Sequence, residues 1–200
     1  MTSEPATDTK IYLTLVDIIF GVLIGATLVT LAPQLVPVKL QLFETWSIYV
    51  AFLIIILSWI FYHKAVFEQE LKIDLMIIID LFLLFLYFYI LFSYNNFPHY
   101  VVAVTIMFGL YLLWTIIRDY GKKKKKTFVE YYKSNIKNQL KLGRSIGIFV
   151  SSVILLILYN YFAAPDYSVE TVGDEIADSI VLGIIAIFAC LYRAIPYFYK

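Results

Sequence analysis

Two carboxylates lie within long apolar stretches of this chain, where an ionised side chain is costly. Asp17 belongs to the apolar segment 11–32, and Asp80 belongs to the apolar segment 73–93. Each follows the start of its segment by about two helical turns. Ionisable groups in such segments face a bundle interior or a water-filled path rather than lipid. A carboxylate there can bind a cation, relay a proton or pair with a basic group.

Two further ionisable residues lie at the ends of apolar segments. His63 ends the segment 46–63, and Arg193 lies near the end of the segment 176–194. If the segments cross a membrane in alternate directions, these side chains reach the same depth as the two carboxylates. We therefore predict one inner polar cluster: Asp17, His63, Asp80 and Arg193. Two interpretations stay open, because such a cluster either orders the helices as an ionic network or lines a hydrated vestibule that admits cations or relays protons.

The composition explains which elements would position these residues. Of the 200 residues 62% are hydrophobic, and the mean hydropathy is +0.81. A soluble domain of this length could not bury so much apolar surface. A helix needs roughly 20 mainly apolar residues to cross the hydrocarbon core of a bilayer. Six segments meet that requirement: 11–32, 46–63, 73–93, 98–117, 145–163 and 176–194.

The basic residues give these segments an orientation. With the N-terminus inside, every Lys and Arg except Lys39 falls on the cytoplasmic side, and the loop before the last segment has acidic residues but no basic one. Cytoplasmic loops of multi-span proteins carry such an excess of Lys and Arg. The sequence therefore predicts an all-α polytopic membrane helix bundle in the cell membrane, with six transmembrane helices and both termini cytoplasmic.

Four regions follow along the chain. They are a polar tail (1–10), transmembrane helices 1 to 4 (11–117), a basic cytoplasmic loop with an amphipathic helix (118–144), and helices 5 and 6 with a short tail (145–200). The amphipathic helix either lies on the inner leaflet or extends the fifth span.

The basic loop holds a run of five lysines: Lys122, Lys123, Lys124, Lys125 and Lys126. Near a membrane surface each basic residue contributes about 1 kcal/mol of attraction to anionic lipids. The run therefore contacts anionic inner-leaflet lipids, docks a protein partner, or serves only to set the topology. No domain surrounds it that would present a reading surface, so we expect no nucleic-acid partner.

Small residues recur every three or four positions on one face of three segments. On the first segment Gly21 and Gly25 follow Asp17, with Leu28 next along the same face. The other two faces consist of Gly143, Gly147 and Ser151, and of Gly183, Ala186 and Cys190. Such faces let helices approach closely and favour a tightly packed bundle and a homo-oligomer. On the first segment the glycines could instead leave room beside the carboxylate for an ion or water.

Aromatic residues are 18% of the chain and gather towards the ends of the segments. One group is expected at the outer interface: Tyr87, Phe88, Tyr89, Phe92, Tyr94 and Phe97. A second group is expected at the inner interface: Tyr192, Tyr197, Phe198 and Tyr199. Because aromatic belts anchor helices at headgroup level, we assign both groups to anchoring and to no ligand.

Sequence motifs for catalysis are missing. The chain has no nucleophile elbow, P-loop, dinucleotide fingerprint or metalloprotease motif. One cysteine and two histidines are too few to build a cysteine or histidine metal site. We therefore expect a protein that is not an enzyme and needs neither a cofactor nor a metal.

Three stretches in the first half carry a family resemblance. They are Asp17-Ile-Ile-Phe-Gly-Val-Leu-Ile-Gly, then Ser58-Trp59-Ile60-Phe61-Tyr62-His63-Lys64, then the apolar segment around Asp80. They resemble the first three helices of the prokaryotic relatives of the endolysosomal six-span potassium channel family, over roughly residues 11–100. Leu15 and Val16 stand where that family has Phe and Ser. The resemblance implies assembly around a central pore, with a network of Asp17, Trp59 and His63 behind it.

These observations favour a homo-oligomeric channel, or channel-like protein, for monovalent cations such as potassium. The first segment would line the path, with Asp17, Gly21, Gly25 and Leu28 on it or beside it. Apolar side chains would form the constriction, because the chain has no carbonyl-filter sequence. Two other functions stay open. One is a proton- or ion-coupled transporter, and the other is a non-transporting scaffold or effector that docks a partner through the basic loop.

Overall fold

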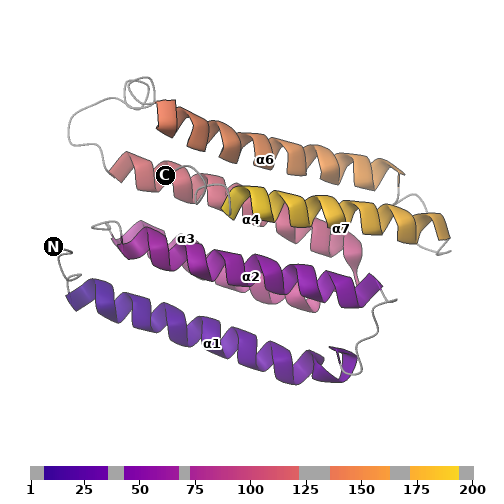
Figure 1. Ribbon diagram of the computed structural model, residues 1–200, viewed down its shortest axis with the longest axis horizontal. Helices are drawn as coiled ribbons and strands as arrows, with labels where there is room; N and C mark the ends of the chain where they lie inside the picture. The colour runs from indigo at the N-terminus through magenta and orange to yellow at the C-terminus, as the bar shows by residue number, and fades with distance from the viewer. Residues whose placement is uncertain (1–6, 36–42, 68–72, 122–135, 163–171, 194–200) are drawn as a thin grey trace.

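The computed structural model describes five stretches of the chain: residues 7–35, 43–67, 73–121, 136–162 and 172–193 (Figure 1). Within them the chain is helical apart from the turn 93–96. The helices are α1 (Thr7–Leu35), α2 (Phe43–Phe67), α3 (Ile73–Phe92), α4 (Phe97–Gly121), α6 (Ile136–Phe162) and α7 (Val172–Arg193). The all-α class predicted from the sequence is confirmed for these residues.

The tight turn between α3 and α4 shows how local sequence sets the helix ends. The Asn96 amide donates to the carbonyl of Ser93 at 2.9 Å, which closes the turn after α3. The side-chain Oδ1 of Asn96 accepts a hydrogen bond from the amide of His99 at 3.4 Å, and this caps the start of α4. Pro98 falls in the first turn of α4, where a missing N–H costs nothing.

Two helices begin inside the regions expected as a polar tail (1–10) and a basic loop (118–144). α1 begins at Thr7, inside the range expected as a polar tail. α6 runs without interruption from Ile136 to Phe162, so the end of the basic loop belongs to the same helix as the fifth apolar segment. The lysine run 122–126 lies outside the described residues.

Over the residues that the structure describes, two helices are long and apolar enough to cross a membrane. They are Phe97–Ile117 within α4 and Leu142–Tyr161 within α6. The apolar stretches of the other four helices are shorter over the side chains that the structure describes: Thr14–Val29, Thr45–Ile60, Ile78–Phe92 and Ile176–Tyr192. The structure is therefore an all-helical assembly with two candidate membrane spans.

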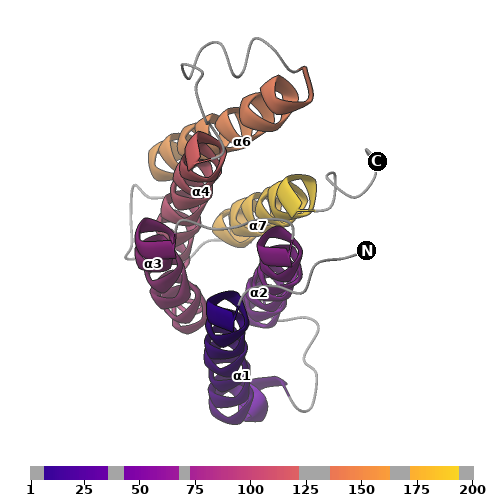
Figure 2. The ribbon, with the colours of Figure 1, turned by 90° about the vertical axis from the view of Figure 1, so that its left-hand side faces the viewer.

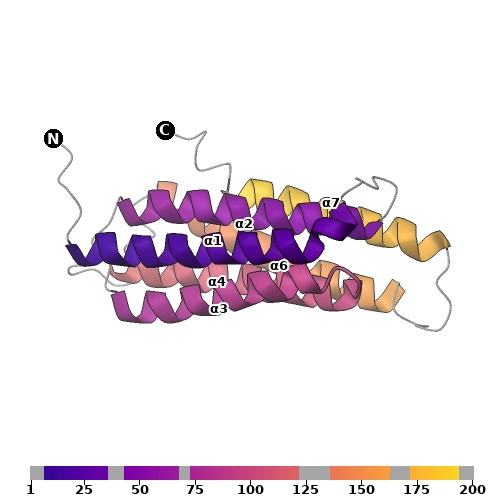
Figure 3. The ribbon, with the colours of Figure 1, turned by 90° about the horizontal axis from the view of Figure 1, so that it is seen from below.

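The six helices run along a common direction, and consecutive helices alternate in direction (Figures 1 and 3). Contacts link α2, α3, α4, α6 and α7 in a ring. Viewed end-on, α3 and α4 lie on one side and α2 and α7 on the other, with α6 at one end of the bundle and α1 at the opposite end (Figure 2). In this ring α3 packs against α2 and α4, and α6 packs against α4 and α7. The contact between α7 and α2 closes the ring. α1 lies against α2 and α3 at the edge of the ring.

Large side chains fill the centre of the ring. Phe108 and Tyr100 are among the largest fully buried side chains, and the Phe108 ring lies 6.4 Å from the rings of Phe188 and Tyr192. α4 and α6 approach each other at Gly109, where an added Cβ would lie 3.0 Å from Cε2 of Phe149. The described part of a single chain is therefore packed with side chains at its centre.

Candidate functional site

The first-helix residues predicted to line a path share the outward face of α1. Asp17, Gly21 and Gly25 are exposed, and Leu28 is 48% exposed. The opposite face of α1 packs on the bundle through Val16, Phe20, Leu23 and Thr27. Within one chain, therefore, this face is open to whatever surrounds the protein.

Within one chain, the glycines on the outward face of α1 do not allow a close contact with another helix. A Cβ added at Gly21 or Gly25 would meet no atom within 4 Å, and the same holds at Gly143, Gly147 and Gly183. Within one chain, therefore, these glycines do not provide the close helix approach expected of the three small-residue faces. The close approach occurs instead at Gly109, which follows the buried Thr105 by four residues on α4.

A hydrogen bond joins Asp17 to α2. The indole Nε1 of Trp59 donates to Oδ1 of Asp17 at 2.9 Å. Both side chains are exposed, so the bond lies at the surface of the bundle, beside the outward face of α1. Hydrogen bonds to an ionised carboxylate are stronger than those between neutral groups. Two members of the network implied by the family resemblance thus meet, while the side chain of His63 lies outside the described residues.

The second carboxylate has a different environment. Asp80 is only 8% exposed and lies on the buried face of α3. Asp17 is exposed on α1, at the edge of the bundle. The structure does not describe the side chains of His63 and Arg193, so the inner polar cluster of four residues stays a prediction.

A buried group of hydroxyls, which the sequence did not indicate, links α2, α3 and α4. The hydroxyl of Tyr111 is hydrogen-bonded to Oγ of Ser58, and it lies 2.7 Å from the hydroxyl of Tyr87. All three residues are 3% exposed. A chain of hydroxyl groups thus crosses three helices near the centre of the bundle.

The same group of hydroxyls continues into α7. The hydroxyl of Tyr192 donates to the carbonyl of Tyr111 at 2.9 Å and lies 2.9 Å from Oγ1 of Thr115. The rings of Tyr111 and Tyr192 stack with their centroids 5.1 Å apart. Five residues, here called the tyrosine network, therefore connect four helices: Ser58, Tyr87, Tyr111, Thr115 and Tyr192.

Burial corrects the assignment of three residues to the aromatic belts, while Tyr89 and Phe92 are 49% and 50% exposed. Tyr87, Phe97 and Tyr192 are between 3% and 5% exposed, so they belong to the core and not to an interfacial girdle. One signal in the sequence could have indicated this. Tyr87 follows Asp80 by seven residues, which places the two on one face of a helix.

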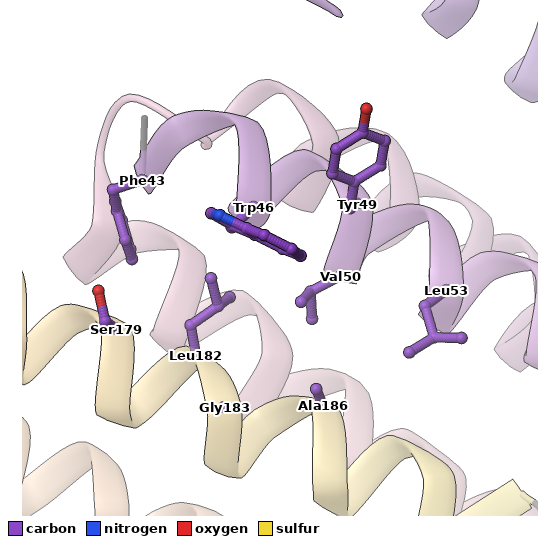
Figure 4. A pocket seen from close by; sticks show the side chains of 9 residues that line it. All are labelled: Phe43, Trp46, Tyr49, Val50, Leu53, Ser179, Leu182, Gly183 and Ala186. Carbon is purple, nitrogen blue, oxygen red and sulfur yellow. The ribbon is translucent and has the colours of Figure 1, made fainter. Parts of the chain in front are cut away.

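A groove lies between α2 and α7 (Figure 4). Its volume is about 540 Å³. Its walls include Trp46, Val50 and Leu53 of α2 and Leu182, Gly183 and Ala186 of α7. The small-residue face predicted on the last segment thus lines a cavity for part of its length.

Comparison with known proteins does not place this chain in a family. No family model matches it, and no curated protein or solved structure matches it either. The described residues hold no group of three or more His, Cys, Asp or Glu side chains that could bind a metal ion. Three features remain for a functional interpretation: the outward face of α1, the tyrosine network and the groove between α2 and α7.

Proposed function

We propose that this protein is a six-span protein of the cell membrane, with both termini cytoplasmic, that conducts monovalent cations as a homo-oligomer. In the assembly the α1 helices line a path on a shared axis. One observation carries the proposal. Asp17, Gly21, Gly25 and Leu28 all lie on the exposed face of α1, the helix at the edge of the bundle.

Helix lengths and surface character support the placement in a membrane. The described helices have from 20 residues in α3 to 29 in α1. At about 1.5 Å per residue, each reaches the roughly 30 Å thickness of the hydrocarbon core. Large apolar side chains on α1, α3 and α6 point outwards: Val29 is 80%, Phe85 71% and Ile157 62% exposed. Lipid is the solvent that such a surface favours.

The packed centre of the ring supports a path between chains. Phe108, Tyr111 and Tyr192 occupy the space between α4 and α7. An ion would have to displace these side chains to cross within one chain. A path on an axis shared by several copies of α1 requires no such displacement.

The outward face of α1 has the chemistry that such a path needs. Asp17 supplies a negative charge that attracts cations, and Trp59 fixes the orientation of its carboxylate. The two glycines keep the path wide along the middle of the helix. Leu28 lies 11 residues, or about 16 Å, from the carboxylate. The Leu28 side chains of several copies would form an apolar ring around the path, and such a ring gates a pore by dewetting.

Cation flux in liposomes tests this proposal. The purified full-length protein should release potassium from loaded vesicles. Leu28→Ser should raise the flux, since a hydroxyl lowers the dewetting barrier. Phe85→Ser is the matched control, because it makes the same change on an exposed side chain of α3. No flux from the unmodified protein, or equal effects of the two substitutions, would contradict the proposal.

A second candidate function is supported by Asp80. A buried carboxylate on the same helix face as Tyr87 suits a proton- or ion-coupled transporter. In that case Asp80→Asn abolishes gradient-driven uptake while the helical content is retained. The channel instead predicts flux that follows the electrochemical gradient of the ion and does not saturate at low concentration.

A further inference from the structure

The groove between α2 and α7 has walls without charge (Figure 4). Aliphatic side chains of both helices and the ring of Phe43 form most of its lining, and Ser179 is one of the few polar residues. Trp46 and Tyr49 stand on the α2 side, and their rings meet edge-on with centroids 6.1 Å apart. A neutral apolar wall of this kind complements a hydrocarbon ligand and no ionic one.

The length of the groove matches one leaflet of a bilayer. Its lining runs along α2 from Phe43 to Leu53, which are ten residues apart and therefore span about 15 Å. Half of a hydrocarbon core of roughly 30 Å has the same thickness. The aromatic pair of Trp46 and Tyr49 stands towards the start of α2, where amphipathic rings meet lipid headgroups.

The groove is too small to enclose a whole helix. A helix of about 10 Å diameter and about 15 Å length fills on the order of 1,200 Å³. The groove offers about 540 Å³, less than half of that. Gly183 leaves further depth on the α7 side, since a Cβ there would meet no atom within 4 Å. The space therefore suits a thin flexible chain.

The surface beside the groove is apolar as well. Ile180 and Ile187 on α7 are 59% and 58% exposed, and Ile56 on α2 is 43% exposed. A lipid tail in a surrounding bilayer would therefore meet apolar side chains on both helices next to the groove.

We infer that the groove between α2 and α7 binds one acyl chain of a lipid. The inference rests on the placement of the chain in a membrane that we propose above. It does not depend on ion conduction, because the groove lies on α2 and α7 and the proposed path lies on α1.

Photolabelling of the full-length protein in detergent tests the inference. The probe is palmitate that carries a diazirine in its chain. Labelling should saturate, should be competed by unlabelled palmitate, and should map to peptides that contain Trp46–Leu53 and Leu182–Ala186. Labelling that does not saturate, or that is spread evenly over exposed apolar helix faces, would overturn the inference.

Gly183→Leu supplies the decisive variant, because its side chain would occupy the groove. Leu is also a better helix former than Gly, so the substitution favours the fold. The saturable labelling should be lost in Gly183→Leu and retained in Gly147→Leu, a glycine on α6 with equally open surroundings. If labelling persists in Gly183→Leu, the groove is not the site. If instead a dimer of the protein dissociates on this substitution, a second copy covers the groove and the inference is wrong.

Flux through liposomes separates this inference from the proposed function. Saturable labelling without cation flux would leave the acyl-chain site standing and remove the channel. Cation flux without saturable labelling would leave the channel standing and remove the site.

Discussion

The indole Nε1 of Trp59 donates a hydrogen bond of 2.9 Å to Oδ1 of Asp17, and this bond links α2 to α1. α1 packs against only part of the bundle surface, through Val16, Phe20 and Leu23 on one face. A polar contact on the flank of that face resists rotation of α1 about its own axis. Together with the packing of Val16, Phe20 and Leu23, it holds α1 in the orientation that leaves Asp17 outwards.

Trp59→Phe should weaken this link. The substitution keeps an aromatic ring and removes the donor, so we expect a loss of about 1 kcal/mol in the free energy of unfolding. The measurement is SDS-induced unfolding followed by circular dichroism. The double variant with Asp17→Ala should lose little more than either single variant, because both remove the same bond. Fully additive losses would show that the two side chains do not interact.

Tyr111→Phe should destabilise the bundle. The substitution removes the hydroxyl that joins Ser58 and Tyr87, and leaves those buried groups without that partner. We expect a loss of about 1–2 kcal/mol in the free energy of unfolding. Tyr161→Phe is the matched control, because Tyr161 is 75% exposed and should change stability by less than about 0.5 kcal/mol. Equal losses in the two variants would mean that the tyrosine network contributes nothing of its own.

Substitutions at two glycines should change the stability of the protein in opposite directions. At Gly109 a Cβ would lie 3.0 Å from the Phe149 ring, so Gly109→Val should cost about 1–3 kcal/mol through overpacking of α4 against α6. At Gly147, also on a helix, a Cβ would meet no atom within 4 Å. Gly147→Ala should therefore stabilise the protein by up to about 1 kcal/mol through helix propensity. Thermal unfolding in detergent measures both, and a stabilising Gly109→Val would refute the close approach.

Regular spacing in the sequence predicted the helices and the shared face of Asp17, Gly21 and Gly25 on α1. Apolar segments of sufficient length identified all six described helices, and intervals of four placed Asp17, Gly21 and Gly25 on one side. Both depend on periodicity along a single helix. The spacing could not tell whether that side faces another helix or the surroundings, because this depends on how α1 packs against α2 and α3.

The buried residues were harder to predict for the same reason. Tyr87 and Tyr192 lie near the ends of apolar segments, and position along a span favours an aromatic belt. Their burial depends on which way each helix is turned, and the partners Ser58, Tyr111 and Thr115 come from distant parts of the chain. Gly109 follows Thr105 by four residues, so the spacing of small residues on α4 could have indicated the close approach there.

A single reactive thiol on α1 would test the assembly directly. The chain has one cysteine, the exposed Cys190, so Cys190→Ser provides a background without thiols. On that background Gly25→Cys should react with a water-soluble, charged thiol reagent, and the adduct should block cation flux in liposomes, because this residue lines the proposed path. Phe85→Cys, on the exposed face of α3, should react slowly and leave the flux unchanged, because lipid excludes a charged reagent. If both thiols react at the same rate, or if modified Gly25→Cys still conducts, then α1 does not line a water-filled path and the proposed arrangement of copies around it fails.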